Sequence, residues 1–163
     1  MGEVYNFIDK RGECNPIWMT QVAVEREGLS MVQREDRKVN FVNREGKCVS
    51  DEWFKSASPF IEGFARVQRE KDKEWNFLKP DGTLLSDEWY YASASFTEGI
   101  AKVQRSNSKW YFINKRGVDI CDQGFKVADN FKDGFAKVYT GEDQEIYKLD
   151  KEGVLHPYQG ISH

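Results

Sequence analysis

The chain has 163 residues, of which 31% are charged and 39% hydrophobic, and its formal net charge is -3. Interspersed charges of both signs give no electrostatic basis for holding a phosphate backbone, so we expect no nucleic-acid partner. The sequence shows no basic region followed by an apolar run and no apolar stretch of membrane-spanning length, so we expect a cytoplasmic protein without membrane insertion, or a secreted or surface protein if the chain is a processed fragment.

The first recurring element is a segment rich in aromatic and β-branched residues, a composition typical of β-strands. Each copy ends in a four-residue turn with Asp, Asn or Lys at its first position and Gly at its fourth, the pattern of a hairpin turn with a positive φ at Gly. These turn glycines lie 34, 36, 35 and 36 residues apart. The predicted strands are 5–9, 39–43, 75–79, 110–114 and 146–150, and the glycines are Gly12, Gly46, Gly82, Gly117 and Gly153.

The second element is a connection that begins with Ser-Asp-Glu-Trp in two of its copies. It ends with a phenylalanine that lies three residues before the glycine of the next turn in each copy. We predict that the phenylalanines are buried anchors, because each precedes an acidic-Gly turn and an apolar strand. These turns are the second landmark on the same period. The phenylalanines are Phe60, Phe96 and Phe131, and the turn glycines are Gly63, Gly99 and Gly134.

The third element is a strand in which Ala and Val alternate with Arg or Lys, which predicts one packed and one solvated face. It is expected at 64–68, 100–104 and 135–139. A second, shorter strand is expected after each hairpin turn, as at 47–50 and 83–86. In the predicted sheet, a third strand pairs with the next first strand, which pairs with the next second strand.

The hairpin-turn glycines and the acidic-Gly turns recur with the same spacing of about 35 residues, which indicates stacked structural units. We predict an all-β fold of tandem three-stranded β-repeats, each about 35 residues long, in an open curved array. A small closed propeller-like ring is the alternative. The chain is expected to form a single repeat domain, 1–163, with units 5–37, 38–73, 74–109 and 110–143, a partial unit 144–156 and a tail 157–163.

The motif Phe-x-Glu-Gly-hydrophobic-Ala-x-Val, a polar turn and Trp-x-aromatic-Ile-Asn-x-x-Gly resembles the WG repeat, also called the KWG repeat, of bacterial proteins. The resemblance covers 5–155. Trp75 and Trp110 match the family's Trp, but Asn76 and Tyr111 replace the glycine that follows it. The resemblance implies a tandem β-repeat without known catalytic residues, used for scaffolding or binding, and it implies no particular ligand.

Catalytic, metal and cofactor sites are not expected. Both histidines follow the last repeat, and the three cysteines show no CxxC or ligand cluster, so we interpret them as small packing residues. The acidic series Glu62, Glu98 and Asp133 could in principle form a glycosidase pair. Because these residues recur once per unit, a turn requirement explains them better.

The candidate binding residues are aromatic or cationic. Trp53 and Trp89, with Trp18 near the same register, either form a stripe for a sugar or a protein, or plug the space between units, which we favour. Trp75 and Trp110 are predicted to be core. If the tryptophans are plugs, the ligand surface is expected among Arg66, Lys102 and Lys137.

The sequence therefore predicts a non-enzymatic protein-interaction or scaffolding module. A carbohydrate-binding protein that uses the Trp stripe is the alternative. A protein is the expected partner, with a glycan as the second choice and a homodimer through edge strands as a further expectation.

Overall fold

The computed structural model describes residues 5–7, 17–22 and 26–158, with side chains from residue 26 onward. Within these ranges the chain forms β-strands and no helix, as the sequence predicts. The strands are β1 (Tyr5–Phe7), β2 (Ile17–Val22), β3 (Ser30–Arg34), β4 (Val39–Val42), β5 (Ser56–Ala57), β6 (Ala65–Gln68), β7 (Trp75–Leu78), β8 (Ala92–Ser93), β9 (Ile100–Gln104), β10 (Trp110–Asn114), β11 (Val127–Ala128), β12 (Phe135–Tyr139), β13 (Ile146–Asp150) and β14 (Leu155–Pro157).

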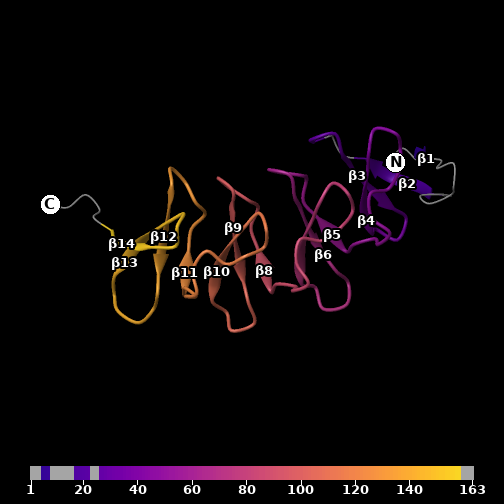
Figure 1. Cartoon of the computed structure of the whole chain (residues 1–163). Coiled ribbons are helices and arrows are strands. Elements are labelled where there is room, and N and C mark those ends of the chain that lie inside the picture. The colour runs from indigo at the N-terminus through magenta and orange to yellow at the C-terminus, as the bar shows by residue number, and fades with distance from the viewer. Residues whose placement is uncertain (1–4, 8–16, 23–25, 159–163) are drawn as a thin grey trace. The chain divides into compact units, whose positions relative to one another are not determined.

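The chain divides into two compact units, Met1–Asp87 and Glu88–His163. The first unit contains the sheets β1-β2-β3-β4 and β5-β6-β7, and the second contains β10-β9-β8 and β11-β12-β13-β14 (Figure 1). All pairings are antiparallel, and none of the four sheets closes on itself.

The predicted pairing of each third strand with the next first strand is confirmed. These pairs are β3 with β4, β6 with β7, β9 with β10 and β12 with β13. In the third sheet, for example, Lys102 lies opposite Phe112 and Gln104 lies opposite Trp110.

The predicted second strand is wrong for most repeats. Among the described residues it is reduced to an isolated bridge in three repeats, Val42 with Cys48, Leu78 with Leu84 and Ile113 with Asp119, and it is a strand at β14. The reason is that two segments share one edge of the first strand. In β4, Val39 exchanges backbone hydrogen bonds with Phe54, so only the far end of the strand is left for Cys48. The short strands β5, β8 and β11 instead pair with the third strands β6, β9 and β12, on the opposite edge of each sheet.

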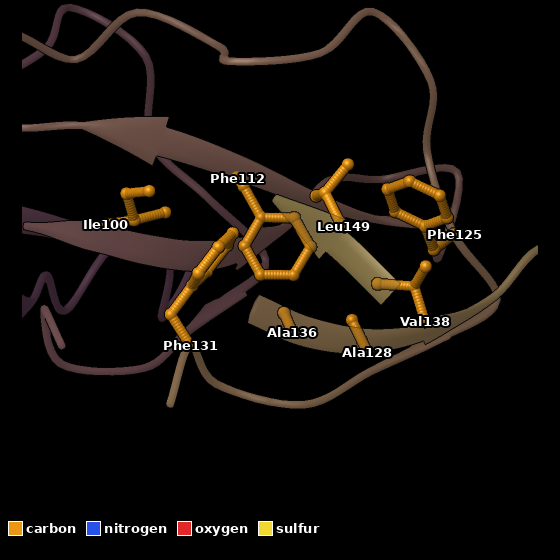
Figure 2. Close-up of a cluster of buried hydrophobic side chains, with 8 residues drawn as sticks. All are labelled: Ile100, Phe112, Phe125, Ala128, Phe131, Ala136, Val138 and Leu149. Atoms are coloured by element: carbon orange, nitrogen blue, oxygen red, sulfur yellow. The ribbon is translucent and has the colours of Figure 1, made fainter. Parts of the chain in front are cut away.

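The anchors predicted from the sequence are confirmed, since Phe60, Phe96 and Phe131 expose only 2%, 1% and 3% of their surface. Phe60 packs edge-on against Phe41, with ring centroids 4.8 Å apart. Phe131 packs in the same way against Phe112 at 5.3 Å, within a core that also contains Val138 and Leu149 (Figure 2). Phe60 lies between β5 and β6, and Phe131 lies between β11 and β12, so these two anchors join one sheet to the preceding sheet.

The position after the repeat's Trp holds a buried asparagine in two copies. Asn40 and Asn76 are fully buried, and each donates its side-chain amide to a backbone carbonyl ten residues later, of Ser50 and Ser86 at 2.9 and 2.8 Å. These bonds satisfy a buried polar group and tie the connection to the first strand.

The cysteines are not all alike. Cys48 is disulfide-bonded, and its partner lies outside the described residues, so its interpretation as a simple packing residue is wrong. Cys121 is a free, half-buried thiol. No helix of the described ranges is long and apolar enough to cross a membrane.

Candidate interaction surfaces

The acidic-Gly turns join neighbouring repeats. In each turn the acidic residue and the glycine both have positive φ, and the flanking residues exchange backbone hydrogen bonds, which defines a tight type I′ hairpin. Glu98 accepts hydrogen bonds from the amides of Asp133 and Gly134, at 2.6 and 2.9 Å. Glu27 likewise accepts one from Gly63 at 3.0 Å. The carboxylate of one turn therefore binds the backbone of the next.

The surroundings of the Glu98 carboxylate stabilise its charged form, as expected for a carboxylate with a structural role. The hydrogen bond from Gly134 and then that from Asp133 hold its pKa below the usual value, and the ammonium of Lys151 lies 3.4 Å away. These contacts make Glu98 a link between two acidic-Gly turns. The sequence had suggested a turn requirement, but it gave no sign that Glu27 and Glu98 reach the next acidic-Gly turn.

The third-strand cations lie over aromatic rings. Arg66 is 5.1 Å from the ring of Trp75, and the ammonium of Lys102 is 4.7 Å from that of Trp110. Lys102 also donates to the carbonyl of Ala128 at 2.7 Å. Burial lowers the pKa of Arg66. Both cations thus have structural contacts. Lys137 is exposed, and its ammonium lies 5.4 Å from the ring of Tyr158.

Trp75 and Trp110 differ from the core residues that the sequence predicts. Both are only half-buried, and the register places each on the same sheet face as the cation that lies over its ring. The strand alternation was assigned correctly, but the packing of a Lys or Arg stem on an indole was not foreseen.

Trp53 and Trp89 are also half-buried, so neither side chain is fully buried between units nor fully exposed for ligand binding. One face of Trp53 is covered by the guanidinium of Arg34, 4.4 Å from the ring centroid. The side chain of Trp18, the third predicted member of the stripe, lies outside the described side chains.

The fourth unit, 110–143, has a different aromatic residue at this place. Gly124 occupies the position of Trp53 and Trp89, and Tyr111 occupies the position of the buried asparagines. A Cβ at Gly124 would lie 2.5 Å from the Tyr111 ring. Arg105, the counterpart of Arg34, lies 4.6 Å from that ring. The large Tyr111 on the strand thus accompanies the small Gly124 in the loop, whereas in the two preceding units a smaller asparagine on the strand accompanies a tryptophan in the loop.

Arg105 is the most heavily bonded cation in the second unit. It forms salt bridges with Glu88 at 2.6 Å and with Asp119 at 3.0 Å, and the hydrogen bond to Glu88 is the main reason that its pKa is raised. Tyr111 is held as well, since its hydroxyl accepts a hydrogen bond from Asn107 at 2.9 Å. This network is a structural cluster.

The last sheet has one buried and one exposed face. Ala128, Ala136, Val138 and Leu149 lie in the core of the second unit. The opposite face carries mainly apolar and basic side chains, and we call it the terminal face. It consists of Val127, Phe135, Lys137, Tyr139, Ile146, Lys148, Asp150 and His156.

The apolar members of the terminal face are unusually exposed, with 54% for Val127, 39% for Phe135 and 47% for Ile146. The ammonium of Lys148 lies 5.3 Å from the Phe135 ring, and the Phe135 and His156 rings meet edge-on at 6.1 Å. His156 also contacts Asp150 at 2.8 Å, which lowers the pKa of Asp150. Of this face, only Lys137 was a site prediction from the sequence.

Among the described residues, no group of three or more His, Cys, Asp or Glu side chains is placed to hold a metal ion. His156, the one histidine with described geometry, pairs with a turn carboxylate at the edge of the last sheet.

No protein-family model matches the sequence, and no curated protein matches it. Solved structures with detectable similarity include BamB from Moraxella catarrhalis, with 10% identity, a TM-score of 0.44 and coverage of 86% of this chain and 49% of that chain. The WD40 β-propeller domain of Doa1 has 13% identity and a TM-score of 0.39, with coverage of 85% and 52%.

The computationally designed Ika4 protein has 14% identity and a TM-score of 0.42, with coverage of 97% and 98%. The chain spans about half the length of the BamB and Doa1 chains, at 49% and 52%. It is therefore similar to these β-proteins, at a level that supports no statement about ligand or activity.

Proposed function

We propose that the chain is a non-enzymatic protein-interaction module built from WG-like repeats, and that the terminal face binds its partner. The observation that carries the proposal is the exposure of Phe135 and Ile146 beside Lys137 and Lys148 on one flat sheet face. Contiguous exposed apolar surface bordered by charge is typical of protein-interaction sites.

Comparison with the preceding sheet supports this assignment. In β10, Phe112 lies opposite Lys102 and is buried beneath Phe131, which lies between β11 and β12 of the next sheet. In β13 the same register position, opposite Lys137, is occupied by Lys148. The charged residue disfavours stacking of another identical repeat. A partner with apolar side chains and carboxylates suits the remaining surface.

The proposal is tested by site-specific photo-crosslinking in the host cell. A photoreactive amino acid at Ile146 is expected to give a discrete crosslinked product, and the same probe at Val118, an equally exposed turn residue, is the matched control. Phe135→Asp in the same chain is expected to abolish the product, because a central aromatic contact is worth about 2 kcal/mol or more. Equal crosslinking from both probes, or none from Ile146, would contradict the proposal.

A further inference from the structure

Two lysines face each other on the terminal face. Lys137 in β12 lies directly opposite Lys148 in β13, so both side chains leave the same face of the sheet. Their ammonium groups lie 5.4 and 5.7 Å from the centre of the Tyr158 ring, so the two positive charges converge on one aromatic side chain. Like charges directly opposite each other destabilise a sheet. The pair therefore lowers the stability of the fold unless an anion lies close to it.

The described part of the chain supplies no carboxylate for this lysine pair. Neither lysine forms a salt bridge with any residue that the structure describes. Asp150, the acidic residue of the terminal face, accepts hydrogen bonds from the amides of Glu152 and Val154, each at 2.9 Å, and contacts His156 at 2.8 Å. Its carboxylate is therefore already engaged by its own turn and by the imidazole.

The other third-strand cations are placed differently. Arg66 lies opposite Phe77 and Lys102 lies opposite Phe112, so each faces an aromatic residue instead of a second cation. Lys102 also donates to the carbonyl of Ala128 at 2.7 Å. Among the described pairs of a third and a first strand, only β12 and β13 set two cations against each other.

The lysine in place of phenylalanine also bears on what can cover this face. Phe112 is buried under Phe131, whose ring meets it edge-on at 5.3 Å. The same contact made on Lys148 would bury an ammonium group against an apolar ring without an acceptor, which is unfavourable. A further repeat of the same kind therefore does not suit this face. A segment that brings a carboxylate does, because it supplies the missing acceptor.

We propose that Lys137 and Lys148 form a binding site for the carboxylate of an Asp or Glu side chain in an acidic segment of the partner protein. The carboxylate lies between the two ammonium groups and accepts a hydrogen bond from each. Phe135 and Ile146 lie on the two sides of the lysine pair and contact apolar residues of the same segment. Because the segment belongs to the partner of the terminal face, this site rests on the proposed function.

The test uses a short acetylated and amidated peptide in which Leu and Glu alternate. Titrated at low salt into the ¹⁵N-labelled full chain, the peptide is expected to bind saturably and to shift the amide signals of Lys137 and Lys148. The peptide with Gln in place of Glu is expected to bind about tenfold more weakly, since it loses a charged hydrogen-bond acceptor.

Two protein variants locate the site. Lys148→Glu sets a carboxylate opposite Lys137, so it is expected to raise the melting temperature at low salt by about 1–4 °C and to abolish peptide binding. Lys109→Glu makes the same charge change in an exposed turn of the second unit and is expected to leave peptide binding unchanged. The spectra also show that each variant is folded.

Three results would overturn the carboxylate site. The first is no peptide binding at millimolar concentration, and the second is equal binding of the Glu and Gln peptides. The third is binding of inorganic phosphate as tightly as of the peptide, because the site would then not select an acidic segment.

The crosslinking experiment separates this site from the proposed function. A product from the probe at Ile146 that Lys148→Glu does not diminish would support the partner and refute the carboxylate site. Absence of any product from Ile146 would contradict the proposed function, whereas the peptide titration would still decide whether the lysine pair binds a carboxylate.

Discussion

Single residues in this chain are best understood through their counterparts in other repeats. The position after the repeat's Trp is Asn40, Asn76 or Tyr111, and the loop position before the buried aromatic is Trp53, Trp89 or Gly124. An asparagine accompanies a tryptophan, and the tyrosine accompanies a glycine. The two positions therefore share a space that accepts one large ring.

A substitution at Gly124 tests this shared space. Its new Cβ would lie 2.5 Å from the Tyr111 ring, which Asn107 and Arg105 hold in place. We expect Gly124→Ala to destabilise the protein by about 1–3 kcal/mol, as overpacking does. Chemical denaturation measures the loss, and adding Tyr111→Asn should recover most of it. An unchanged midpoint for Gly124→Ala alone would show that the ring moves freely.

The anchor phenylalanines give a second test at the residue scale. Phe131 is 3% exposed and packs against Phe112, so Phe131→Ala leaves a cavity between the third and the fourth sheet. The expected cost is about 3–5 kcal/mol of unfolding free energy in a denaturant titration. A loss below about 1 kcal/mol would mean that the preceding sheet collapses into the space or that the contact is absent in solution.

At the scale of elements, the sequence predicted the first and third strands almost to the residue. The alternation in Ala136-Lys137-Val138 and the aromatic content of 110–114 are local signals, so no knowledge of the neighbours was needed. The second strand failed because its partner edge is shared with the segment around Phe54, which is a tertiary effect. The hydrogen bonds from Glu27 and Glu98 to the next acidic-Gly turns, and the terminal face, depend on how segments far apart in the sequence pack, so they have no local signature.

The pairing of carboxylate and turn predicts a pH dependence. Glu98 has a lowered pKa in the folded protein, so its contribution to stability is complete above the unfolded pKa and is lost as pH falls toward the folded value. Glu98→Gln should therefore lower the melting temperature at pH 7 and reduce the loss seen on acidification below about pH 4.5. Parallel melting curves of both proteins from pH 7 to pH 3 measure this. Identical acid profiles would show that the carboxylate is not bonded.

At the scale of the whole molecule, the sequence prediction of an open curved array stays a prediction. The strands β1 and β14 are sheet edges, which suits an open arrangement and also the expected edge-strand dimer. Small-angle X-ray scattering of the monomer is expected to fit a curved rod. A profile that fits a compact ring would contradict the prediction and favour the propeller-like alternative.

The central claim is that the side chains of the terminal face are exposed in the folded chain. They are therefore available to bind a partner and contribute little to the stability of the fold. The most direct measurement is a denaturant titration of the double variant Phe135→Ser, Ile146→Ser beside the wild type. Because both side chains are more than a third exposed, at 39% and 47%, we predict an unfolding free energy within about 1 kcal/mol of the wild-type value. A loss of about 3 kcal/mol or more would show that this face is part of the core and would contradict the account.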